Sequence, residues 1–125
     1  MPIAYWCILV AALLPFVWVK YAKSGSGSDN RSPRDDYDGL SPQKRRAYAA
    51  HQNAFESFPF FAIAVLAAMT LGASAGALNG LAVLYVLLRL AHGLFYITDK
   101  SALRSLSFGL AMMTNVAIFV LPALR

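Results

Sequence analysis

The sequence has few ionised side chains and a single cysteine. Only 14% of its 125 residues are Asp, Glu, Lys or Arg, whereas about a quarter is usual for a soluble domain. The hydrophobic share is 58%, so the composition argues against a water-soluble domain and for a lipid environment. The lone Cys7 excludes an intrachain disulfide. Because it lies in an apolar segment, it is most simply a small packing residue.

Four apolar runs divide the chain, and each reaches or approaches the ~20 helical residues that cross a bilayer. We therefore predict an all-α, four-transmembrane-helix bundle in one domain over residues 1–125, with helices at about 3–21, 42–71, 78–98 and 102–124. Residues 24–41, rich in Gly, Ser, Pro and Asp, are expected to form a solvated loop. The first run could instead be a secretory signal, but it lacks a basic n-region, and Lys20 and Lys23 follow its apolar block.

The net charge of +5 could suggest nucleic acid, but the placement of the basic residues indicates membrane topology instead. Lys100 and Arg104 lie in or beside the third connection, and the second connection has no basic residue. The basic residues in or beside the first connection are Lys20, Lys23, Arg31, Arg34, Lys44, Arg45 and Arg46. The positive-inside rule then places the first and third connections in the cytoplasm and both termini on the non-cytoplasmic side. We expect a multi-pass integral membrane protein whose partner is the lipid bilayer, with no nucleic acid.

Tryptophans and glycines suggest how the helices sit and pack. Trp6 and Trp18, near the two ends of the first helix, suit interfacial anchoring. Gly72, Gly76 and Gly80 repeat every fourth residue. This repeat predicts a tight loop followed by close helix approach.

Polar side chains extend into the second predicted helix. Arg46, Asn53 and Glu56 are separated by seven and three residues, so they share one helical face. Pro59 removes the hydrogen bond otherwise made to the carbonyl of Phe55. We expect the resulting bend to open room beside the Glu56 carboxylate.

The third helix carries Arg89, His92 and Tyr96 at i, i+3 and i+7, again on one face. One charge near the lipid core costs about 2.5 to 3.5 kcal/mol, so leaving both Glu56 and Arg89 unpaired would cost ~5 to 7 kcal/mol. The second and third helices are predicted antiparallel neighbours joined by a short turn. We therefore predict that Glu56 and Arg89 lie within hydrogen-bonding reach of one another, within or between protomers.

These polar residues converge on the cytoplasmic end of one bundle. Arg104 and Ser105 open the fourth helix, where a cation is unfavourable to the helix dipole. Singly, Arg46 and Arg104 could be topology charges, His92 a hydrogen-bonded interior histidine and Tyr96 an interfacial anchor. Jointly they indicate a polar site made of Arg46, Asn53, Glu56, Arg89, His92, Tyr96, Arg104 and Ser105.

At these residues the chain resembles the MAPEG family, the membrane-associated proteins in eicosanoid and glutathione metabolism, over essentially its whole length. The first matching motif is RA-x5-N-x-x-E-x-F-P, with Arg46, Asn53, Glu56 and Pro59. The second is R-x-A-H-x-x-x-Y, with Arg89, Ala91, His92 and Tyr96. The Arg104-Ser105 pair is a third matching feature. The chain looks closest to short bacterial members, in which a DN-x-x-PR loop like residues 29–34 also occurs.

The resemblance implies a homotrimer in the bacterial inner membrane, with glutathione bound as co-substrate near the cytoplasmic face between subunits. It implies catalytic roles for Arg104, which would hold the sulfur as thiolate, and for Tyr96. The implied substrate-binding residues are Arg46, Asn53, Glu56, Arg89, His92 and Ser105. The thiolate would attack a lipophilic electrophile arriving from the bilayer, or reduce a lipid hydroperoxide.

Two alternatives remain open. Enzymatic members commonly place arginines where this chain has Ala49 and Gln52, so it could be a non-catalytic protein of the same fold that presents lipid to a partner, as the lipoxygenase-activating branch does. It could also be a small transporter or structural membrane subunit that uses Glu56 and His92 for protons or fold specificity. No metal site is predicted, because His51 and His92 lack a recognisable ligand set.

Overall fold

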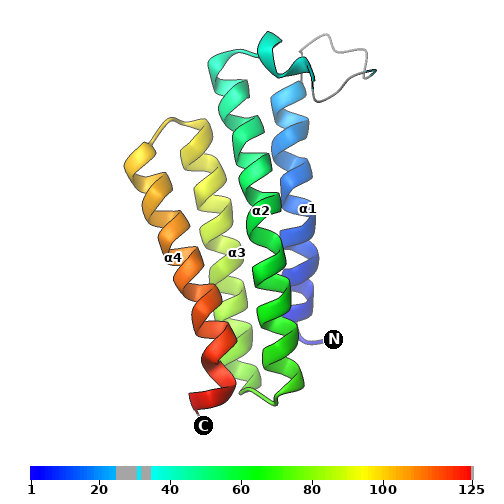
Figure 1. Ribbon diagram of the computed structural model, residues 1–125, viewed down its shortest axis with the longest axis vertical. Coiled ribbons are helices and arrows are strands. Elements are labelled where there is room, and N and C mark those ends of the chain that lie inside the picture. Colours follow the sequence, from blue (N-terminus) through cyan, green and yellow to red (C-terminus); the bar gives the residue numbers. More distant parts are fainter. Residues whose placement is uncertain (25–30, 32–34, 125) are drawn as a thin grey trace.

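Four long α-helices run side by side, each antiparallel to the one before it (Figure 1). The computed structural model describes residues 1–24, 31 and 35–124, and these contain no strand. The elements are α1 (Ile3–Lys23), the 3-10 helix η1 (Asp35–Gly39), α2 (Pro42–Thr70), α3 (Ala75–Ile97), α4 (Ser101–Val120) and the 3-10 helix η2 (Leu121–Leu124). The predicted all-α, four-helix architecture is confirmed.

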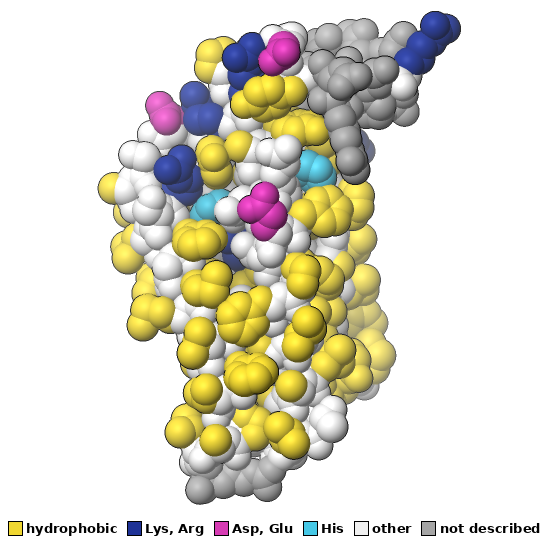
Figure 2. Space-filling model, viewed as in Figure 1, with side chains coloured by type: hydrophobic (Ala, Val, Ile, Leu, Met, Phe, Trp, Pro, Cys, Tyr) yellow, Lys and Arg dark blue, Asp and Glu magenta, His cyan; other side chains and the backbone are white. Residues whose placement is uncertain are grey.

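All four helices are long and apolar enough to cross a membrane. Hydrophobic side chains cover most of the visible face, and charged side chains gather toward the end where α1 passes into α2 and α3 into α4 (Figure 2). Both termini lie at the opposite end (Figure 1). That the charged end is cytoplasmic stays a prediction of the positive-inside rule.

The helix ends follow local chemistry. The Ser41 side chain accepts a hydrogen bond from the Lys44 N–H at 3.3 Å and Pro42 opens the helix, as expected for the start of α2. In α4 the regular helix stops at Val120 and gives way to η2, because Pro122 has no N–H for the next α-helical bond. Of the predicted DN-x-x-PR loop, only Arg31 lies within the described residues.

Two tight turns join the helices through left-handed residues. Gly72 (φ 73°) follows α2 and Asp99 (φ 61°) follows α3. After α3, the Lys100 N–H donates to the Phe95 carbonyl at 2.9 Å, and the corresponding bond after α2 is also 2.9 Å long. These are Schellman ends, which reverse the chain within a few residues. The turn after α3 fixes the direction in which α4 begins relative to α3.

The closest helix approach is not where the glycine repeat predicted it. Among the described residues, no atom lies within 4 Å of a Cβ placed at Gly76 or Gly80, so within the protomer that prediction is wrong. Instead, a Cβ at Gly93 would lie 2.2 Å from Cζ2 of Trp18. Trp18 is only 6% exposed, so its predicted role as an interfacial anchor is also wrong. Its indole fills the space that Gly93 leaves between α1 and α3.

Candidate functional site

A polar pocket of about 290 Å³ opens beside the turn between α3 and α4. Its lining residues are Asn53 from α2, His92 and Tyr96 from α3, and Arg104, Ser105 and Phe108 from α4. All except Phe108 are among the predicted site residues. None of the described residues lining the pocket is acidic, so its electrostatics favour an anion.

The pocket's cation is placed by an aromatic ring. The Arg104 guanidinium carbon lies 4.6 Å from the centroid of the Tyr96 ring, within cation–π range. The ring of His92 meets that of Tyr96 edge-on at 5.7 Å. Because the α3–α4 turn is short, residues at the end of α3 and the start of α4 face each other, and Tyr96 supports Arg104 at the pocket wall.

Arg89 lies behind this wall, 3% exposed, and its Nη2 donates to Asn53 Oδ1 at 2.6 Å. The predicted contact between Glu56 and Arg89 is therefore not formed within the protomer, where Asn53 takes its place. Glu56 is exposed and makes no ion pair with any described residue. The physical reason is angular: three residues on, Glu56 points about 60° away from Asn53 around α2. The between-protomer form of the prediction stays a prediction.

Glu56 instead borders a second groove, of about 420 Å³, on α2, together with Tyr48, His51, Gln52 and Phe55. The His51 Nδ1 lies 2.8 Å from the Pro15 carbonyl oxygen, so a hydrogen bond joins α1 and α2 there. This groove holds an acidic rather than a basic side chain. It differs in charge from the first pocket.

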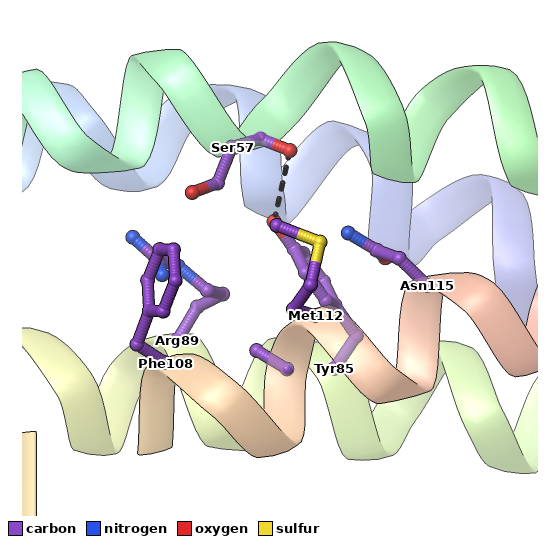
Figure 3. A pocket seen from close by; sticks show the side chains of 7 residues that line it. Ser57, Tyr85, Arg89, Phe108, Met112 and Asn115 are labelled. Carbon is purple, nitrogen blue, oxygen red and sulfur yellow. Dashed lines mark hydrogen bonds between the residues drawn. The ribbon is translucent and has the colours of Figure 1, made fainter. Parts of the chain in front are cut away.

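Deeper in the bundle, a narrow polar niche continues from Arg89 (Figure 3). The Tyr85 hydroxyl donates to the Ser57 carbonyl at 3.4 Å. Asn115 is 1% exposed, and its Oδ1 accepts no hydrogen bond from the described residues. The space between these side chains is too small for a water molecule. Sequence reasoning did not include Tyr85 and Ser57, although Tyr85 lies one helical turn before Arg89 and so shares its face.

A model of the MAPEG family matches residues 3–124. The chain belongs to the MAPEG family. With four apolar helices of spanning length, this MAPEG protein is an integral, multi-pass membrane protein. Searches of curated proteins and of solved structures found no match.

Arg46, a predicted substrate-binding residue, contacts the end of α3 instead. Its Nε and Nη2 each lie 3.4 Å from the Ile97 carbonyl oxygen at the end of α3, and it does not line the polar pocket. No trio of His, Cys, Asp or Glu among the described residues gathers to hold a metal ion. Chemically, the MAPEG pocket offers a cation, a phenol, a hydroxyl and an imidazole around one cavity.

Proposed function

We propose that this MAPEG protein is a glutathione transferase or glutathione-dependent peroxidase acting on lipophilic electrophiles or hydroperoxides. The observation that carries the proposal is the Arg104 guanidinium set against the Tyr96 ring in a pocket lined by no described acidic residue. Such a cation favours thiolate over thiol. Lowering the pKa of a thiol from about 8.5 to about 6.5 corresponds to ~2.7 kcal/mol of preferential thiolate stabilisation. One partly desolvated guanidinium can supply this amount.

Two reactions then become accessible. In transfer, the thiolate attacks an electrophilic carbon and forms a thioether, and the displaced group or carbanion takes up a proton. In hydroperoxide reduction, it attacks the peroxide oxygen and the O–O bond breaks, giving an alcohol after protonation and glutathione sulfenic acid. A second glutathione reduces the sulfenic acid to the disulfide and water. The apolar helix surfaces would let a lipophilic substrate reach the pocket from the bilayer.

The pocket's size supports an assembly. At about 290 Å³, it lies just below the ~300–1,000 Å³ of small-molecule sites, so we propose that a neighbouring subunit completes it. Glu56 is exposed on a membrane-spanning helix and lacks a cation among the described residues, so it calls for a polar partner. We propose a homotrimer in the bacterial inner membrane, with glutathione bound in the Arg104 pocket where neighbouring subunits meet.

A non-catalytic lipid-binding protein of the same fold is the second candidate. The groove on α2 is lined by Gln52 and Glu56 and by no described Lys or Arg, so it offers no permanent cation to bind the carboxylates of glutathione. An apolar groove of about 300 Å³ between α3 and α4, lined by leucines, Met113, Thr114 and Ala117, could hold an acyl chain.

A titration of glutathione thiolate absorbance on the detergent-solubilised protein separates the two candidates. We expect a thiolate signal in the unmodified protein and its loss in Arg104→Ala. Lys100→Ala is the matched control, because Lys100 is an exposed cation of the same connection that does not line the pocket. An absent signal at millimolar glutathione overturns the enzymatic proposal and leaves the lipid-binding one.

A further inference from the structure

Three consecutive cations at the start of α2 each reach a different segment of the chain. Successive residues of a helix point about 100° apart, so Lys44, Arg45 and Arg46 diverge. Each donates to a backbone carbonyl: Lys44 Nζ to Tyr21 at 2.9 Å, Arg45 Nη2 to Asp38 at 2.6 Å, and Arg46 Nε and Nη2 to Ile97, both at 3.4 Å. Charges interpreted from the sequence as topology signals therefore also make specific contacts.

Two of these contacts lie at helix C-termini. Tyr21 is in the last turn of α1, and Ile97 is the last residue of α3. The last four carbonyls of a helix have no partner within the helix and carry partial negative charge. A cation there supplies a donor and offsets this charge. The Tyr21 carbonyl also accepts from the Ser24 N–H at 3.2 Å and from Ser24 Oγ at 2.7 Å. At 3.4 Å the two Arg46 contacts are long, so the attraction is mainly between the guanidinium charge and the helix end.

The α3 end held by Arg46 is the one that positions the pocket's cation. Ile97 directly follows Tyr96, whose ring lies against Arg104. Only residues 98–100 connect α3 to α4, and they form a hydrogen-bonded turn with Asp99 in the left-handed conformation. A shift of the Ile97 carbonyl would therefore move both members of the Tyr96–Arg104 contact.

We infer that Arg46 is a positioning residue for the polar pocket: by holding the C-terminal turn of α3 through the Ile97 carbonyl, it fixes the Tyr96–Arg104 contact. It acts through the turn rather than on a ligand, because it does not line the pocket. This differs from the substrate-binding role predicted for Arg46. The inference rests on the proposed function only in its second test, in which the ionisation of bound glutathione measures how well Arg104 is placed.

The matched pair of variants is Arg46→Gln and Lys44→Gln. Each removes one cation and its hydrogen bonding to a backbone carbonyl at the same end of the bundle, but the carbonyls belong to α3 and α1 respectively. Lys44→Gln also removes the hydrogen bond to Ser24 Oγ and the cation–π contact with the Tyr21 ring, both of which belong to the end of α1. Hydrogen–deuterium exchange on the detergent-solubilised protein is the first measurement. We expect Arg46→Gln to speed exchange at least threefold over residues 94–104 and not over 20–24, and Lys44→Gln to do the reverse. Unchanged exchange over 94–104 in Arg46→Gln overturns the inference.

The second measurement is the pH midpoint at which bound glutathione ionises. With Arg104 less well placed, Arg46→Gln should raise this midpoint by about half a pH unit, roughly a threefold change in the ionisation constant. Arg46→Lys keeps a cation near the helix end and should recover most of the shift. Lys44→Gln should leave the midpoint unchanged. If Arg46→Gln weakens glutathione binding while exchange over 94–104 stays normal, Arg46 contacts the ligand and the positioning role is wrong.

The two proposals fail separately. If the unmodified protein forms no glutathione thiolate, the enzymatic proposal fails, and exchange over 94–104 still decides the role of Arg46. If thiolate forms with the same midpoint in Arg46→Gln, only the positioning role fails. Should Arg46→Gln not fold, Arg46→Lys carries the exchange test. It keeps the cation but loses the second hydrogen bond, so we expect exchange over 94–104 to rise by less than threefold, and unchanged exchange overturns the inference.

Discussion

Replacing Gly93 with alanine should destabilise the bundle more than any other single methyl addition at a described glycine. The added Cβ would lie 2.2 Å from Trp18 Cζ2 and 2.4 Å from Cε2, more than 1 Å short of the ~3.5 Å at which carbon atoms pack. Trp18 is buried, and the overlap falls on the body of its ring, so α1 and α3 must separate or the indole must leave its site. Overpacking of this kind costs ~1–3 kcal/mol. Because the overlap is large, we expect about 3 kcal/mol, or a fall in Tm of roughly 10 °C.

Thermal unfolding in detergent, followed by circular dichroism, measures this effect. The matched control is Gly80→Ala in the same helix, where a Cβ meets no described atom within 4 Å. It should leave Tm unchanged or raise it slightly, because alanine is the better helix former. A smaller ring should relieve the overlap, so Gly93→Ala combined with Trp18→Phe should melt close to Trp18→Phe alone. Equal Tm values for Gly93→Ala and Gly80→Ala would refute the assigned packing.

Three further predictions concern the polar contacts and turns. Asn53→Leu removes the hydrogen bond to buried Arg89 and should cost ~3 kcal/mol in denaturant unfolding; adding Arg89→Met should restore part of the loss, and an additive loss would contradict the pairing. Asp99→Gly should raise stability by about 1 kcal/mol in thermal unfolding, because glycine takes the left-handed conformation without strain, whereas Asp99→Ala should bring no gain. Asn79→Ala removes the side-chain oxygen on α3 that accepts a hydrogen bond from the Ala4 N–H at 3.0 Å. The protection free energy against hydrogen exchange at the start of α1 should fall by about 1 kcal/mol, and unchanged exchange would mean that this cap adds no stability.

The sequence predicted the four helices because lipid-facing segments must be apolar nearly throughout, which leaves long runs in composition alone. It also grouped two residues that line the pocket, His92 and Tyr96, with Arg89 behind them, since i, i+3 and i+7 spacing brings all three to one face whatever the helix packs against. Spacing does not say which neighbour that face meets. Trp18 shows the limit: its position near a helix end gave its depth along the axis, but its direction around the axis was needed to know that it is buried against Gly93.

The choice of Asn53 rather than Glu56 as the partner of Arg89 has an electrostatic consequence. Pairing with Glu56 would have neutralised the guanidinium, whereas the Asn53 amide satisfies a hydrogen bond and leaves the positive charge in place. Arg89 and Arg104 thus both contribute positive potential around a cavity lined by no described carboxylate. The same arrangement leaves Glu56 exposed on α2. The fold therefore separates the charges of its membrane-spanning helices: Arg89 is buried and Arg104 lines the pocket, whereas Glu56 faces outward, toward whatever packs against the bundle.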